Sequence, residues 1–183
     1  GPKQPTAGSL EPCATNNQDP CTSGTLDTVT SFTQDRKNHF SFNFNLARGS
    51  SGTNDFRRFA GATIDFGKKL DGTLESWDAT NPIVLGFKAQ GTTDGKLKLD
   101  FVDIGNHKVT VFIQGLTTDF QKYAITKNLL DSAGAPDFDA TKIHAIAIVV
   151  DDNTTSSASA QGTIEVNTEG LKFNPKLSTT TSS

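Results

Sequence analysis

Apolar and polar residues alternate along short segments of this chain. In residues 39–46, His-Phe-Ser-Phe-Asn-Phe-Asn-Leu, every second side chain is phenylalanine or leucine, and the side chains between them are polar. A period of two places the apolar side chains on one face of a β-strand, whereas a helix would spread them around its circumference. The segment is therefore predicted to be a strand with one buried face.

Similar short runs recur along the chain, and turn-forming Gly, Asp and Asn residues separate them. They predict further strands at residues 62–66, 83–89, 97–101, 109–113, 120–125, 143–150, 162–166 and 171–173. Residues 143–150 are apolar on both faces apart from His144, as expected of a central strand. Residues 127–133 allow a short turn of helix. This spacing of strands and turns predicts an all-β, antiparallel fold, either a sandwich or a barrel, with the phenylalanines facing inward.

Composition changes at both ends of the chain. Residues 1–24 are rich in Pro, Gly, Ser, Thr and Asn, and residues 178–183 are all Ser or Thr. Such segments bury too little apolar surface to offset the entropy lost on ordering. We therefore expect a flexible arm over residues 1–24, a β-sandwich module over residues 25–174 and a Ser/Thr-rich linker over residues 175–183 that tethers the module to further domains.

Both cysteines, Cys13 and Cys21, lie in the N-terminal arm. No other cysteine or paired histidine is near them in the sequence, which argues against a zinc site. We expect a local disulfide, and the alternative is two free thiols in a flexible arm. An oxidised pair is typical of exported proteins, so the chain is expected to be secreted or held at the cell surface.

Charge and hydropathy argue against two classes of partner. The formal net charge is -3 at pH 7, which leaves no basic footprint for nucleic acid. No apolar run approaches the length needed to cross a bilayer. We therefore expect no nucleic-acid partner and no membrane span.

The order of several segments resembles the galactose-binding-like jelly-roll carbohydrate-binding modules found beside bacterial glycoside hydrolases. The resemblance covers residues 59–173 and is carried by FAGATIDFG (59–67), Trp77, IVLGFKAQG (83–91), GLTTDFQKY (115–123), FDATKI (138–143) and GTIEVN (162–167). It implies an antiparallel two-sheet β-sandwich, a jelly roll, that binds carbohydrate.

Calcium is common in that family, held by oxygen ligands from a loop and from the last strand. The candidate ligands here are Asn54, Asp55 and Asn167. Where the family often has paired aspartates after the last strand, this chain has Asn-Thr-Glu at residues 167–169, which lowers the negative charge available to a metal. No other cofactor is expected.

Candidate ligand-binding side chains are of two kinds. Trp77 would offer an indole ring on which a sugar can stack, and the alternative is a structural role in the sandwich. Polar side chains on outward strand faces and in loops would bind hydroxyl or carboxylate groups, and the alternative is that they form a solvated surface. These polar candidates are Asn43, Asn45, Arg57, Arg58, Lys88 and Gln90.

No signature of catalysis is present in the sequence. The carboxylates follow no paired glycosidase motif, the three histidines are isolated, and there is no nucleophile elbow. We therefore expect a non-catalytic extracellular carbohydrate-binding module, or a degenerate relative, attached to a larger protein and bound to a polysaccharide or glycan surface. Two alternatives stay open. One is a structural or protein-interaction β-sandwich module of a cell-surface protein, which the scarcity of Trp and Tyr favours, and the other is a small β-sandwich hydrolase or lyase.

Overall fold

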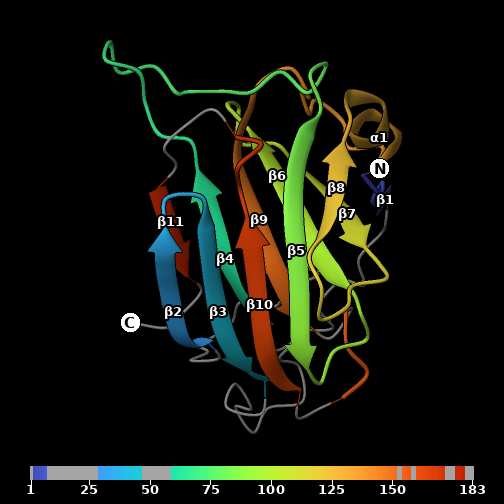
Figure 1. Ribbon diagram of the computed structural model, residues 1–183. Coiled ribbons are helices and arrows are strands. Elements are labelled where there is room, and N and C mark those ends of the chain that lie inside the picture. Colours follow the sequence, from blue (N-terminus) through green and yellow to red (C-terminus); the bar gives the residue numbers. More distant parts are fainter. Residues whose placement is uncertain are drawn as a thin grey trace, which may run out of the picture.

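The computed structural model describes residues 2–7, 29–46, 59–151, 154–157, 160–171 and 176–179. Within these residues the strands form two antiparallel sheets that lie one behind the other (Figure 1). One sheet has six strands, in the order β1 (Thr6–Ala7), β7 (Lys108–Ile113), β6 (Leu97–Asp103), β9 (Ile143–Asp151), β4 (Phe59–Asp65) and β11 (Lys176–Thr179). The other has five strands, in the order β2 (Val29–Arg36), β3 (His39–Asn45), β10 (Gln161–Asn167), β5 (Ile83–Gly91) and β8 (Gln121–Ile125).

The chain changes sheets at most of its connections. Only the pairs β2–β3 and β6–β7 are hairpins within one sheet, whereas every step from β3 to β6 and from β7 to β11 crosses to the opposite sheet among the described strands. This alternation is typical of a jelly roll, in which few strands that follow one another in the sequence are hydrogen-bonded to each other. The predicted all-β, two-sheet fold is confirmed.

Alternation along the strands places the predicted apolar side chains between the two sheets. Phe40, Phe42 and Phe44 of β3 are 1%, 1% and 2% exposed, and Leu99 and Phe101 of β6, in the other sheet, are fully buried. Each such side chain contributes about 1.5–3 kcal/mol on burial. Strand β9 lies between β6 and β4, a central position as predicted, and its inward side chains Ile146, Ile148 and Val150 are buried.

A short helix, α1 (Lys127–Ser132), follows β8 where the sequence allowed one. The hydroxyl of Thr126 accepts a hydrogen bond from the backbone N–H of Leu129 at 3.1 Å, which caps the first turn. Leu129 and Leu130 point into the core. Among the described residues, no helix is long and apolar enough to cross a membrane.

Three strands were not predicted from the sequence. β2 has few apolar residues and two register shifts against β3, so its pattern is weak. β1 and β11 lie within the segments expected to be an arm and a linker, and they pair with the outer strands β7 and β4 of the six-stranded sheet. Parts of both segments therefore belong to the sheet.

Of the predicted strand at residues 171–173, Leu171 is buried outside any strand, and the other two residues lie outside the described part of the chain.

A buried ion cluster joins three strands of the six-stranded sheet. Lys98 of β6 is fully buried, and its Nζ lies 3.0 Å from Oδ2 of Asp151 in β9 and 3.9 Å from Oδ2 of Asp100. The hydroxyl of Thr110 in β7 donates to Asp100 Oδ1 at 2.5 Å. Burying an ammonium group is costly unless it is paired, and here two carboxylates meet it.

Candidate functional site

Strand pairing sets one row of residues across the outer face of the five-stranded sheet. Arg36 of β2 pairs with His39 of β3, and His39 pairs with Asn167 of β10. Asn167 pairs with Gly86 of β5, and Gly86 pairs with Lys122 of β8. Adjacent strands lie about 4.8 Å apart, so the row extends about 19 Å from β2 to β8.

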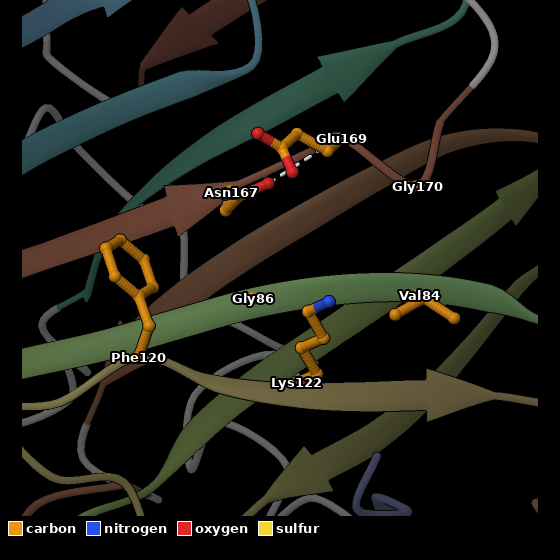
Figure 2. A pocket seen from close by; sticks show the side chains of 7 residues that line it. All are labelled: Val84, Gly86, Phe120, Lys122, Asn167, Glu169 and Gly170. Atoms are coloured by element: carbon orange, nitrogen blue, oxygen red, sulfur yellow. Dashed lines mark hydrogen bonds between the residues drawn. The ribbon is translucent and has the colours of Figure 1, made fainter. Parts of the chain in front are cut away.

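A groove of about 280 Å³ lies over the β8 half of this row, and Gly86 forms its floor. A Cβ atom at Gly86 would lie 3.1 Å from Cβ of Asn167 and 3.7 Å from Cδ1 of Phe120, so the missing side chain keeps the groove open. Figure 2 shows Asn167 and Glu169 on the β10 side of Gly86, and Phe120 and Lys122 on the β8 side. Val84 and Gly170 complete the lining.

Phe120 gives the groove an exposed aromatic ring. The residue directly precedes β8, and its side chain is 42% exposed, against the expectation that the phenylalanines face inward. Its ring centroid lies 5.7 Å from that of His39 in an edge-on contact, and Nζ of Lys88 lies 5.0 Å from the Phe120 centroid. These two contacts orient a ring whose accessible surface suits the C–H face of a sugar.

A chain of charged side chains supports the ring of Phe120. His39 Nδ1 bonds the carboxylate of Asp35, and His39 Nε2 lies 3.2 Å from Oε1 of Glu165. The second oxygen of Glu165 lies 3.0 Å from Nζ of Lys88. The side-chain hydrogen bond with His39 is the main reason that the pKa of Asp35 is below its ordinary value. His39 and Lys88 are thus fixed in place beside the aromatic ring.

A second polar row lies on the same face, separated from the groove by the row in which Glu165 pairs with Lys88. Asn43 of β3 and Gln90 of β5 both pair with Thr163 of β10. The Thr163 hydroxyl donates to Asn43 Oδ1 at 2.5 Å, and Asn43 Nδ2 donates to Ser31 Oγ at 2.6 Å. The structure therefore brings the predicted residues Asn43, Lys88 and Gln90 onto one sheet face, and Asn45 occupies an outward position on the same strand as Asn43.

Trp77 does not offer a stacking surface. Its side chain is 6% exposed, and Nε1 donates to the backbone oxygen of Asn81 at 2.7 Å. Its backbone bonds Ile143 at the start of β9 in both directions, at 2.8 and 3.0 Å. The prediction of Trp77 as a ligand platform is thus corrected, because the indole packs in the core of the sandwich, which was the structural alternative.

Several predicted residues lie outside the described part of the chain. They are the cysteines Cys13 and Cys21, the arginines Arg57 and Arg58, and two of the candidate metal ligands, Asn54 and Asp55. The third candidate ligand, Asn167, lines the groove, and its Oδ1 accepts from the N–H of Glu169 at 2.9 Å. The described residues contain no group of three or more His, Cys, Asp or Glu side chains that could hold a metal ion.

Comparisons with known proteins return only remote structural likenesses. No protein-family model matches the chain, and no curated protein matches it significantly. A family 30 carbohydrate-binding module is 14% identical, with a TM-score of 0.41 over 92% of this chain and 86% of that chain. An agarase is 11% identical, with a TM-score of 0.43 over 83% of this chain and 24% of the agarase.

The xyloglucanase domain of NopAA, a type three effector from Sinorhizobium fredii, was solved in complex with cellobiose. It is 11% identical to this chain, with a TM-score of 0.34 over 89% of this chain and 92% of that domain. Likenesses at such identities and TM-scores carry no argument about ligand or activity. The groove is therefore interpreted from its own side chains.

Proposed function

We propose that this chain is a non-catalytic carbohydrate-binding module whose ligand lies in the groove over Gly86. The observation that carries the proposal is the exposed ring of Phe120, held by His39 and Lys88 beside a floor that has no side chain. A sugar ring stacked on Phe120 would present its hydroxyl groups to the polar side chains on the opposite side of the groove. Asn167 and Glu169 supply the acceptors and donors there.

The carboxylates of this face favour binding over hydrolysis. Glycosidases use two carboxyl groups, one on each side of the scissile bond. Among the described residues that line the groove, Glu169 is the one carboxylate. Glu165, on the same face of the sheet, contacts both His39 and Lys88, so its two oxygens already have protein partners in place of a substrate.

The proposal includes a setting outside the cell and attachment to further domains. A module tethered to another domain raises the local concentration of that domain at a glycan surface, without contributing chemistry of its own. The predicted disulfide between Cys13 and Cys21 and the predicted calcium site remain parts of this proposal.

The test is retention of the protein in native gels that contain polysaccharides of different backbones. We expect retardation by at least one polymer, and we expect Phe120→Ala to weaken that binding about tenfold or more, as loss of a central aromatic contact does. Ile104→Ala is the matched control, because Ile104 is 40% exposed but lies in the β6–β7 turn, away from the groove. No retardation by any polymer, or equal losses in the two variants, would contradict the proposal.

A further inference from the structure

Two further hollows continue the groove at its ends. One, of about 170 Å³, shares Asn167 and Glu169 with the groove and is also lined by Arg36, Lys37, Asn38 and His39. The other, of about 500 Å³, shares Phe120 and Lys122 and is also lined by Pro2, Lys3 and Gln121. Because neighbouring hollows share wall residues, the three adjoin one another from the β2–β3 turn to the segment before β1, and together they are called the depression.

Cationic side chains outnumber carboxylates along this depression. Lys3 and Lys122 lie at the β8 end, and Arg36 and Lys37 lie at the β2 end. Among the described residues of the lining, Glu169 is the one acidic side chain. The whole chain carries a net charge of -3, so this face has the opposite sign to the molecule.

None of these four cations forms an ion pair with a carboxylate in the described part of the chain, although Arg36 lies close enough to Asp35 to help lower its pKa. The ion pairs there involve other lysines and the histidines, such as Lys88 with Glu165 and Lys127 with Asp131. Asp35, next to Arg36 in the sequence, bonds His39. The depression thus presents cationic groups that are available to an anionic ligand.

We infer that the groove selects an acidic polysaccharide, one that carries carboxylate or sulfate groups. The inference rests on the proposed function and adds the class of ligand. Ammonium and guanidinium groups form charge-assisted hydrogen bonds with such anions, while Phe120 stacks on a sugar ring. Arg36 and Lys122 stand at opposite ends of the row of about 19 Å, so they contact different sugar units of one polymer.

An acidic polypeptide would match the charge but not the aromatic ring. The open floor at Gly86 beside the exposed ring of Phe120 suits a rigid sugar ring whose C–H groups pack on the aromatic face. A peptide would gain most from unpaired strand edges, and on this face the strands β3, β10 and β5 are paired on both sides. The charge pattern is therefore assigned to a glycan.

The experiment compares polymers that share a backbone and differ in charge. The first pair is polygalacturonate and its fully methyl-esterified form, and the second is a sulfated galactan and its desulfated form. Affinities are measured by native gel retardation and calorimetry at 50 mM and 500 mM NaCl. We expect the acidic member of at least one pair to bind about tenfold or more tightly at low salt, with the advantage reduced at high salt because exposed charges are screened. The pair that shows this advantage identifies the anion as carboxylate or sulfate.

Two groups of variants separate charge from stacking. Lys122→Gln and the double variant Arg36→Gln/Lys37→Gln should each weaken binding of the acidic polymer about two- to fivefold or more, since each removes exposed charge contacts. Both should leave the affinity for the neutral polymer unchanged. Lys96→Gln is the control, because Lys96 is an exposed lysine in the turn after β5 that does not line the depression.

The possible outcomes distinguish this inference from the proposed function. Equal binding of acidic and neutral polymers, unaffected by Lys122→Gln, overturns the inference and leaves glycan binding intact. Failure of every polymer to bind contradicts both. Binding of polyglutamate as tight as that of the acidic polymers, with no loss on Phe120→Ala, identifies an acidic polypeptide as the ligand and also overturns the inference.

Discussion

Phe120 faces outward, although the apolar residues of the strand that follows it face inward. Tyr123 and Ile125 are 1% and 0% exposed, so the inward positions of β8 have odd numbers. Phe120 has an even number and precedes the strand, which places it out of phase with them. Counting the period of two strictly would have identified an outward aromatic residue, whereas grouping all the phenylalanines as core did not.

Trp77 failed as a prediction for the opposite reason. Its neighbours Ser76 and Asp78 are polar, which is typical of a loop residue with an accessible ring. The burial of the indole depends on Ile143, 66 positions further along the chain, because that residue bonds the Trp77 backbone. Such a contact is a tertiary one, and a pattern of neighbouring residues does not contain it.

Lys98 allows a stability prediction. Lys98→Met keeps the length of the side chain but leaves the buried carboxylates of Asp100 and Asp151 without the ammonium group that now pairs with them. Removing one partner from a buried ion pair typically costs about 3–5 kcal/mol. We expect a loss of that size in the free energy of unfolding, measured by urea denaturation at pH 7. A variant as stable as the parent would show that the ion cluster does not stabilise the fold.

Asp103 allows a pH prediction. Its carboxylate is 3% exposed and accepts backbone N–H groups of Gly105, His107 and Asp139 at 2.8–2.9 Å. Burial by itself raises the pKa of Asp103, but the N–H donors of His107 and Asp139 and the His107 ring outweigh it, so the pKa lies below its ordinary value. The stabilisation is therefore complete above the pKa of the unfolded chain and is lost as the pH falls through the lower pKa of the folded protein.

Asp103→Asn should accordingly destabilise the protein by about 1.5–3 kcal/mol at pH 7, the usual worth of hydrogen bonds to a charged group. The difference between the two proteins should shrink when urea denaturation is repeated near pH 3. A difference that does not change with pH would contradict the assignment of the effect to the ionised carboxylate.

At the scale of elements, the sequence predicted strands where alternation is clear and missed those where it is not. β3, β5 and β6 have regular apolar faces, and the prediction placed Lys88 and Gln90 correctly on the outward face of β5. β2 was missed because Val29 and Phe32 are its only large apolar residues. The groove itself was not predictable, since it depends on the register that aligns β5 with β10 and β8.

Gly86 tests that register. Gly86→Ala would place a methyl group at the floor of the groove, 3.1 Å from Cβ of Asn167. The side chain of Asn167 would have to shift slightly to accommodate it. The fold should persist, because the substitution adds a methyl group on an outward position of a strand. We expect the variant to bind the polysaccharide that retards the parent protein about threefold or more weakly. A cooperative unfolding transition would show that the variant is still folded. Unchanged affinity would indicate that the ligand does not lie over Gly86.

At the scale of the whole molecule, the two sheets differ in what their outer faces carry. The outer face of the five-stranded sheet has the depression, the exposed ring of Phe120 and the four cations of the lining. The six-stranded sheet holds the buried ion cluster of Lys98 and is extended at both edges by the short strands β1 and β11. Under the proposed function, the five-stranded sheet is the binding face and the six-stranded sheet supports it.

The most direct measurement is a titration of the isotope-labelled protein with an oligosaccharide of the retained polymer, followed by NMR of the backbone amides. The account predicts that the largest shift changes occur at Gly86, Lys122 and Asn167, with small changes at Thr63 and Ala147, which pair on the six-stranded sheet. Large changes confined to the six-stranded sheet would contradict the account, because they would place the ligand on the opposite face.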